Sequence, residues 1–278
     1  MSLPPAKLLE QFKYYWILPV ISLLVWWGML VAMMAVWAGN NYKIFPAQNA
    51  NSHVPYISDI GASGVKALFI AAGAVQAVFF VLSLAAERYL RHAGRLEPNR
   101  RRFEKILAAF AIVFASIGQI GLILLTILDT YRHHTAHAFC LGIFVVGLGI
   151  SAFLTSVEFT LLSKSYYEVH WLRLSYILKY VWLFVAISFA IAFAVLIFES
   201  DNDDSGAIIE WTLAYWYSIY GIILAIDLLP ATKTSQRREK SGGYMLENRF
   251  DLPTTDTETG TTSGTTELAG HENPGLEK

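Results

Sequence analysis

Six long runs of apolar residues, separated by short polar segments, dominate the pattern of this chain. Each run can form a helix of about 20 residues, the length needed to cross the hydrocarbon core of a bilayer at roughly 1.5 Å per residue. The first run is longer than the roughly 7–15 apolar residues of a secretory signal, so we expect it to be retained. The pattern predicts an all-α integral membrane protein with six transmembrane helices, near 15–36, 65–86, 106–128, 138–162, 176–198 and 208–229.

The pattern changes after residue 230. Residues 231–278 are rich in Thr, Gly, Ser and Glu and contain few apolar side chains. Such a composition cannot bury enough apolar surface to offset the entropy lost on folding. We therefore expect a six-helix transmembrane domain over 1–230 and a disordered cytoplasmic tail over 231–278.

Composition supports the membrane assignment. The 278 residues are 55% hydrophobic and 15% charged, whereas soluble domains carry about 25% charged residues. Cys140 is the single cysteine, which excludes an intrachain disulfide and a metal site built from several cysteines. The formal net charge is −1, and we expect no nucleic-acid partner because the basic residues are sorted by membrane side.

The distribution of Lys and Arg predicts the orientation in the membrane. If the N-terminus is cytoplasmic, 18 of the 21 basic residues lie in inner segments, and only Lys43, Lys66 and Arg132 lie outside. Basic residues accumulate on the cytoplasmic side of membrane proteins. We therefore expect both termini to be cytoplasmic.

The first predicted outer loop contains a segment, 55–62, with unusual residue types. It combines a rigid proline, an aromatic hydroxyl, two helix-capping side chains and a glycine: Pro55, Tyr56, Ser58, Asp59 and Gly61. Ser and Asp commonly cap helix N-termini, and the second long helix follows directly. Two interpretations remain open: a capped, tightly packed helix start, or a polar site at the membrane face that includes Tyr56 and Asp59.

The second predicted outer loop is crowded with titratable side chains: Asp129, Arg132, His133, His134 and His137. Asp129, His133 and His137 recur at intervals of four, so a helical turn would place them on one face. We interpret them as a polar cluster that joins the two outer loops and contacts a lipid headgroup, without a cofactor. The alternative is a zinc site, with Asp59 as a further ligand, in a membrane hydrolase. The acidic third outer loop, 199–206, is expected only to be solvated.

Charged residues also occur inside the predicted helices. Glu158 is costly at hydrocarbon depth and needs a partner or access to water. Lys179, early in the next helix, should lie at similar depth, which predicts a Glu158–Lys179 pair; a proton or lipid-headgroup site is the alternative. Asp227, near the inner end of the last helix, is expected to extend toward the interface.

The inner segment 87–105 contains six Arg and one Lys against three Glu, a formal charge of +4. Arginine offers planar, bidentate contacts to phosphate. The candidate contacts to anionic lipid are Arg95, Arg100, Arg101, Arg102 and Lys105. Alternatively, the segment serves only as a topology signal.

The segment Pro55–Asp59, the pattern Asp129-x-x-x-His133-His134-x-x-His137 and Glu158 together resemble the FRAG/DRAM/SFK family of six-helix membrane proteins, over about residues 10–230. The long first outer loop, the basic inner loop and the Thr-rich tail are most similar to the fungal SFK branch. This resemblance implies a plasma-membrane protein linked to phosphatidylinositol 4-kinase signalling and lipid asymmetry. Other members of the family are GPI-anchor remodelling factors and autophagy modulators.

Together these observations predict a non-catalytic membrane protein that organises or senses lipids and supports a phosphoinositide pathway. Its expected partners are membrane lipids, including phosphoinositides, and a lipid-kinase complex on the cytoplasmic side. Two alternatives remain: a lipid- or GPI-modifying enzyme that uses the outer Asp/His cluster, and an autophagy modulator of an endolysosomal membrane. A Golgi address is also compatible with the sequence.

Overall fold

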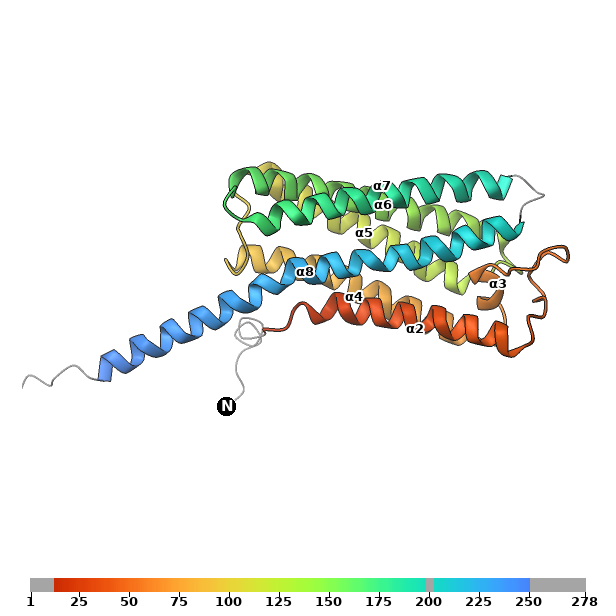
Figure 1. Ribbon diagram of the computed structural model, residues 1–278, viewed down its shortest axis with the longest axis horizontal. Helices are drawn as coiled ribbons and strands as arrows, with labels where there is room; N and C mark the ends of the chain where they lie inside the picture. The colour runs from red at the N-terminus through yellow and green to blue at the C-terminus, as the bar shows by residue number, and fades with distance from the viewer. Residues whose placement is uncertain (1–12, 199–202, 251–278) are drawn as a thin grey trace, which may run out of the picture. The chain divides into compact units, whose positions relative to one another are not determined.

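The computed structural model describes residues 13–198 and 203–250. These residues form helices and connecting turns, without a strand in the described ranges (Figure 1). The helices are α2 (Ile17–Gly39), α3 (Ile57–Gly61), α4 (Lys66–His92), α5 (Arg102–Ile127), α6 (His134–Ser165), α7 (His170–Phe198) and α8 (Asp203–Phe250).

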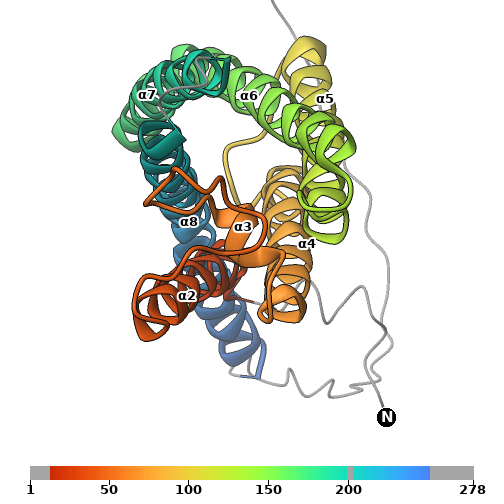
Figure 2. The same cartoon turned by 90° about the vertical axis from the view of Figure 1, so that its right-hand side faces the viewer.

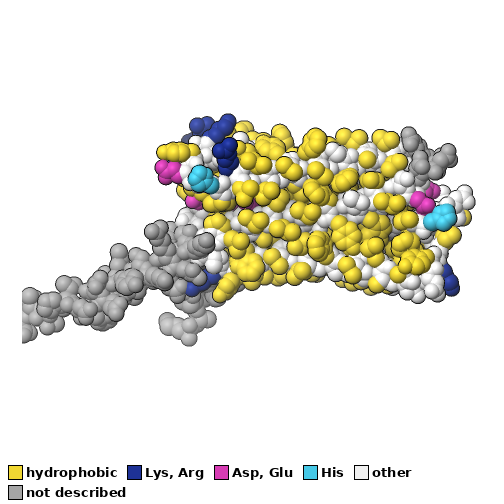
Figure 3. Space-filling model, viewed as in Figure 1, with side chains coloured by type: hydrophobic (Ala, Val, Ile, Leu, Met, Phe, Trp, Pro, Cys, Tyr) yellow, Lys and Arg dark blue, Asp and Glu magenta, His cyan; other side chains and the backbone are white. Residues whose placement is uncertain are grey.

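Six of these helices are long and apolar enough to cross a membrane. They are α2, α4, α5, α6, α7 and the part of α8 from Asp203 to Thr232, with mean hydropathies from 1.5 to 2.6 over their most apolar windows. Large apolar side chains cover the sides of these helices (Figure 3), where lipid tails rather than water would contact them. The prediction of an all-α protein with six transmembrane helices is confirmed.

The helices extend further than the apolar runs that predicted them. For example, α4 continues to His92, and α5 begins at Arg102 rather than near residue 106. The apolar run marks only the hydrocarbon-spanning part, whereas the helix continues into polar surroundings because its backbone hydrogen bonds are satisfied internally. In α8 the described helix passes residue 230 and continues to Phe250, while 251–278 lie outside the described residues. The disordered tail therefore stays a prediction.

The long helices form a ring within the compact unit that ends at Arg238. Contacts link α2 to α4, α4 to α5, α5 to α6, and α6 to α7 (Figure 2). Indole hydrogen bonds complete the ring: Trp182 and Trp216 donate to each other's backbone carbonyls between α7 and α8 at 2.9 and 3.1 Å. Trp26 of α2 donates to the carbonyl of Ala214 in α8 at 2.9 Å.

The helices α5 and α6 approach each other closely. A Cβ added at Gly147 would lie 2.8 Å from the backbone nitrogen of Gly118, and one at Gly121 would lie 2.9 Å from the carbonyl oxygen of Cys140. Small residues let membrane helices approach in this way. By contrast, Gly142 and Gly149 have open space around the added Cβ.

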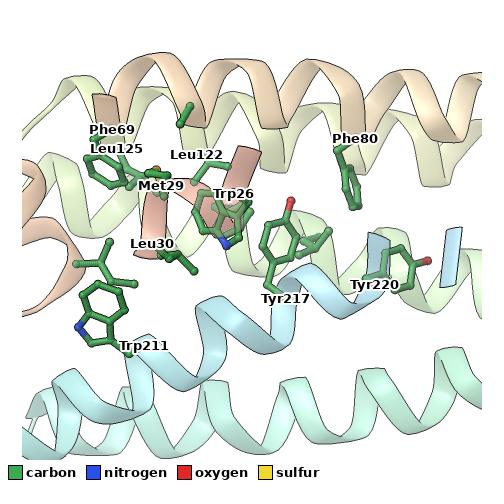
Figure 4. Packing of buried hydrophobic residues seen from close by; sticks show 14 of the residues in the cluster. Trp26, Met29, Leu30, Phe69, Phe80, Leu122, Leu125, Trp211, Tyr217 and Tyr220 are labelled. Carbon is green, nitrogen blue, oxygen red and sulfur yellow. The ribbon is translucent and has the colours of Figure 1, made fainter. Parts of the chain in front are cut away.

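Aromatic side chains from several helices pack in the interior of the ring (Figure 4). The ring of Tyr217 in α8 packs edge-on against Trp26 and Phe144, with centroids 5.6 and 5.3 Å apart. The Tyr217 hydroxyl accepts hydrogen bonds from the amides of Gln76 and Gln119. A polar bridge among α4, α5 and α8 therefore lies within an apolar core.

Candidate functional site

The short helix α3 lies at one end of the ring, among the ends of α2, α4 and α8 (Figure 2). We call this the α3 end; it comprises residues 40–65, residues 128–133 and the start of α8. Tyr56 is the N-cap of α3, and its backbone N–H donates to the Asp59 carboxylate at 3.0 Å. Asp59 therefore caps α3, whereas α4 begins after Val65 without a side-chain cap. The expectation that Ser58 and Asp59 cap the second long helix was wrong, because a separate helix intervenes.

The start of α8 holds the loop before α3 in place. The Asp204 carboxylate accepts hydrogen bonds from the backbone N–H groups of His53 and Val54, at 2.6 and 2.9 Å, and from the Ser52 hydroxyl at 2.9 Å. Asp203 accepts a hydrogen bond from the Asn49 amide at 2.5 Å. These two acidic residues are thus structural ligands of the loop, not merely solvated as we expected; 199–202 lie outside the described residues.

Further contacts fix the motif that precedes α3. The Glu210 carboxylate accepts the backbone N–H of Ile57 at 2.7 Å, and the indole of Trp211 donates to the Pro55 carbonyl at 3.0 Å. Tyr56 packs over Gly206, where an added Cβ would collide with its hydroxyl. Burial, followed by the nearby carboxylates, raises the pKa of Tyr56 to about 12. Gly61 lies against the Phe69 ring, with no room for a side chain.

A polar cavity of about 250 Å³ lies at the α3 end. Four charged side chains line it: Asp59, Lys66, Asp129 and Arg132. The rest of its wall consists of Pro46, Ala47, Ala62, Ser63 and Tyr131. The structure therefore places Asp59 of the first loop and Asp129 of the second loop on the wall of one cavity.

The two carboxyl groups of the polar cavity differ in their surroundings. Asp129 accepts hydrogen bonds from Lys66 Nζ at 2.6 Å and from the Arg132 backbone N–H at 2.8 Å. The Lys66 hydrogen bond is the main reason that the pKa of Asp129 is lowered. Asp59 is 5% exposed, and burial raises its pKa to about 6 despite the hydrogen bond from Tyr56. The sequence analysis did not predict Lys66 as a site residue, although Lys66 is one of the three basic residues expected on the outer side of the membrane.

The histidines of the second loop do not converge. His137 is buried, with Nδ1 2.9 and 2.8 Å from the carbonyl oxygens of Leu125 and Leu128. His133 and His134 are exposed. Among the described residues, no three His, Cys, Asp or Glu side chains are grouped so that they could hold a metal ion. The interval of four would place Asp129, His133 and His137 on one face only in a continuous helix. The helix α6 begins at His134, so Asp129 and His133 precede it.

A second, mainly apolar cavity of about 130 Å³ lies inside the ring. Its wall includes Trp26, Phe69, Leu122, Phe144 and Trp182, with a few polar groups from Ser58, His137, Glu210 and Tyr217. Ser58 lines this cavity while the adjacent Asp59 lines the polar one. The helix α3 therefore separates a polar cavity from an apolar cavity.

At the opposite end, Glu158 is buried and accepts a hydrogen bond from the Asn99 amide at 2.7 Å. The Arg91 guanidinium is bound to Glu87 at 2.9 and 3.0 Å, and its Nε lies 3.9 Å from Glu158. The predicted Glu158–Lys179 pair is therefore wrong, because α4 and the turn after it supply the partners of Glu158.

Lys179 instead forms a salt bridge with Asp227, and it also donates to the Ser175 hydroxyl at 2.7 Å. The Lys179 and Asp227 side chains are both 0% exposed. The expectation that Asp227 extends toward the interface was wrong, because α7 brings it a buried cation. Breaking such a pair would leave an uncompensated charge in the bundle.

We call this opposite end the basic end; it comprises the turns 93–101 and 166–169 with the adjoining helix termini. Arg100, Arg101, Arg102 and Lys105 are exposed there, at the start of α5. Arg95 is 5% exposed and donates to the Ala231 carbonyl at 3.2 Å. Arg95 is thus a packing residue, and its assignment as a lipid contact was wrong.

Comparisons with known proteins agree with this architecture. A family model described as "Frag1/DRAM/Sfk1/Cwh43P N-terminal domain" matches residues 14–231. The chain belongs to this family. The range matched includes all six membrane-spanning helices, and this Frag1/DRAM/Sfk1 protein is an integral membrane protein.

Two curated relatives are similar to this Frag1/DRAM/Sfk1 protein over most of its length. Protein SFK1 of Saccharomyces cerevisiae is 27% identical over 308 residues, covering 84% of this chain and 86% of the relative. Protein sfk1 of Schizosaccharomyces pombe is 30% identical over 218 residues, covering 78% of this chain and 65% of the relative. No solved structure matches the chain.

Proposed function

We propose that this Frag1/DRAM/Sfk1 protein is a non-catalytic membrane protein of the plasma membrane that gathers phosphoinositides at its cytoplasmic face. In this proposal the basic end is cytoplasmic. By concentrating the substrate or product of a phosphatidylinositol 4-kinase beside itself, the protein supports the kinase pathway.

The observation that carries this proposal is the group of exposed basic residues at the start of α5. Arg100, Arg101 and Arg102 precede or begin the helix, and Phe103 and Ile106 follow with 57% and 50% of their surfaces exposed. If the apolar side chains directly after the arginines enter the lipid tails, the guanidinium groups lie at headgroup depth, as the proposal requires. The helix N-terminus adds a partial positive charge at the same place.

The backbone at this point is held independently of the arginine side chains. The Glu104 carboxylate accepts the backbone N–H groups of Arg100 and Arg101 at 2.8 and 3.2 Å. The Arg100 guanidinium lies over the Tyr166 ring, 4.5 Å from its centroid, which orients one planar group while leaving it exposed. Lys164 and Arg173 are also exposed at the adjoining ends of α6 and α7.

These residues are sufficient for a phosphoinositide site of useful strength. Each basic residue near an anionic leaflet contributes roughly 1 kcal/mol, so three arginines contribute a few kcal/mol. Arginine also forms paired hydrogen bonds with phosphate that lysine cannot reproduce. The proposed site should therefore depend on charge first and on guanidinium geometry second.

The experiment replaces Arg100, Arg101 and Arg102 with Gln and measures the phosphoinositide retained around the protein in bilayer discs. We expect retention to fall by about tenfold or more and to become less sensitive to salt. A matched variant with Lys at the three positions keeps the charge and should retain most of the binding. A third variant, Lys43→Gln at the α3 end, should behave as the wild type. Unchanged retention in the triple Gln variant, with unchanged phosphoinositide levels in cells, would refute the proposal.

A further inference from the structure

The polar cavity at the α3 end contains charges of both signs. Asp129 is already bound to Lys66 and to the Arg132 backbone. Asp59 accepts the Tyr56 backbone N–H on one oxygen, and no salt bridge from a basic side chain reaches it within the described residues. Asp59 nevertheless lines the cavity while it is only 5% exposed. A buried acceptor without a cation thus faces a space that Arg132 also lines.

We propose that the polar cavity binds a zwitterion that carries a primary ammonium and a phosphate, the charge pattern of an ethanolamine phosphate headgroup. The ammonium donates to Asp59, and the phosphate contacts the Arg132 guanidinium with Lys66 beside it. This inference goes beyond the proposed function, because it assigns a separate ligand to the opposite end of the bundle.

The charge balance of the cavity favours a zwitterion over a simple ion. Asp59 and Asp129 offset Lys66 and Arg132, so the four groups together carry no formal charge. A simple anion at Arg132 would lie near the Asp59 carboxylate, and a simple cation at Asp59 would lie near two basic side chains. A ligand with both charges can bind the Asp59 carboxylate and the Arg132 guanidinium at the same time. Both contacts would be charge-assisted hydrogen bonds, which are stronger than neutral ones.

The shape and lining of the cavity favour a small headgroup with a primary amine. Its volume of about 250 Å³ accommodates a phosphate and a two-carbon amine. Pro46, Ala47 and Ala62 provide short apolar walls for the methylene groups. Quaternary ammonium groups are usually held by cages of aromatic rings, but Tyr131 is the single aromatic residue among the lining residues. A trimethylated choline also cannot donate a hydrogen bond to Asp59.

The test uses the full chain in bilayer discs with equal amounts of phosphatidylethanolamine, phosphatidylcholine and phosphatidylglycerol. After extraction into detergent, the lipids that remain bound are quantified by mass spectrometry. We expect phosphatidylethanolamine to be retained about tenfold over the other two, the effect of one charge-assisted hydrogen bond. A second arm adds soluble glycerophosphoethanolamine or glycerophosphocholine and measures thermal stability. Stabilisation by the soluble ethanolamine compound without lipid retention assigns the site to a free phosphoamine, which keeps the same chemistry.

Three variants separate the two contacts. Asp59→Asn keeps an acceptor for the Tyr56 N–H but removes the charge, so the preference for ethanolamine over glycerol headgroups should disappear. Arg132→Gln should lower retention of both phosphatidylethanolamine and phosphatidylglycerol. Lys43→Gln removes an exposed basic residue outside the cavity and should change nothing.

Equal retention of the three lipids by the wild type, together with no effect of either soluble compound, would overturn the inference. Phosphatidylethanolamine retention that stays at the wild-type level in Arg132→Gln would also overturn it; that variant alters an exposed side chain and decides the question even if Asp59→Asn fails to fold. None of these variants should alter phosphoinositide retention at the basic end. The failure of one proposal is therefore distinguishable from the failure of the other.

Discussion

At the residue scale, Asp59 has the most informative environment at the α3 end. Its burial opposes ionisation, whereas the hydrogen bond from the Tyr56 backbone favours the charged form, and the nearby Asp203 opposes it again. Burial is the largest of these effects, so the pKa rises from 3.8 to about 6. The carboxyl group is thus mostly ionised at neutral pH, at a cost in stability.

This cost predicts an unusual dependence of stability on pH. Because the folded-state pKa exceeds the unfolded value, the folded protein retains the Asp59 proton to higher pH. Its contribution to the free energy of unfolding is greatest below about pH 4 and is lost as the pH rises through about 6, roughly 1–3 kcal/mol in total. Asp59→Asn removes this loss. As the pH rises from about 4 to about 6, the variant should therefore become more stable relative to the wild type.

The measurement is the thermal unfolding midpoint of both proteins in detergent across that pH range. Asp129 has a lowered pKa and works in the opposite sense at lower pH, but it is present in both proteins and cancels in the difference. Two parallel curves would contradict the environment described for Asp59.

The sequence correctly indicated which buried charged residues need a partner, but it did not identify the partner. A charge at hydrocarbon depth needs a partner, and Glu158 and Lys179 both have one. The partner itself depends on which helices adjoin: α8 brings Asp227 to Lys179, while the turn after α4 brings Asn99 to Glu158. The apolar pattern along the chain does not reveal which helices are neighbours in the ring, so it could not predict these partners.

At the element scale, α5 and α6 form a close backbone contact. Gly147 faces the Gly118 backbone so closely that an added Cβ must displace one helix. The sequence alone does not distinguish Gly147 from Gly142, because close packing depends on which helix face meets the neighbour. Likewise α3 has only five residues, too few for a helical period to be visible in the sequence.

The matched pair Gly147→Ala and Gly142→Ala tests this contact. An added methyl group at Gly147 meets backbone atoms that cannot rotate away, so we expect a loss of about 1–3 kcal/mol in the free energy of unfolding. Gly142 has open space, and Ala should be neutral or slightly stabilising there because of its higher helix propensity. Thermal unfolding in detergent measures both, and equal midpoints for the two variants would show that the helices are further apart than described.

At the scale of the whole molecule, the bundle has two chemically different ends. The basic end carries exposed arginines at the start of α5 and buried ion pairs behind them, whereas the α3 end carries the polar cavity. The positions of Lys and Arg along the chain predicted this difference between the two ends. Consecutive membrane helices alternate in direction, so alternate connecting segments lie at the same end of the bundle. The positive-inside rule predicts that the basic end faces the cytoplasm, and the proposed phosphoinositide function depends on this orientation.

The most direct test of the account is therefore the accessibility of each end in intact cells. Cys140 is buried, so a membrane-impermeant maleimide can report on a single introduced cysteine at exposed Asn49, at the α3 end, or at exposed His92, at the basic end. We expect Asn49→Cys to react in intact cells, and His92→Cys to react only after the membrane is permeabilised. Labelling of His92→Cys but not Asn49→Cys in intact cells would contradict it.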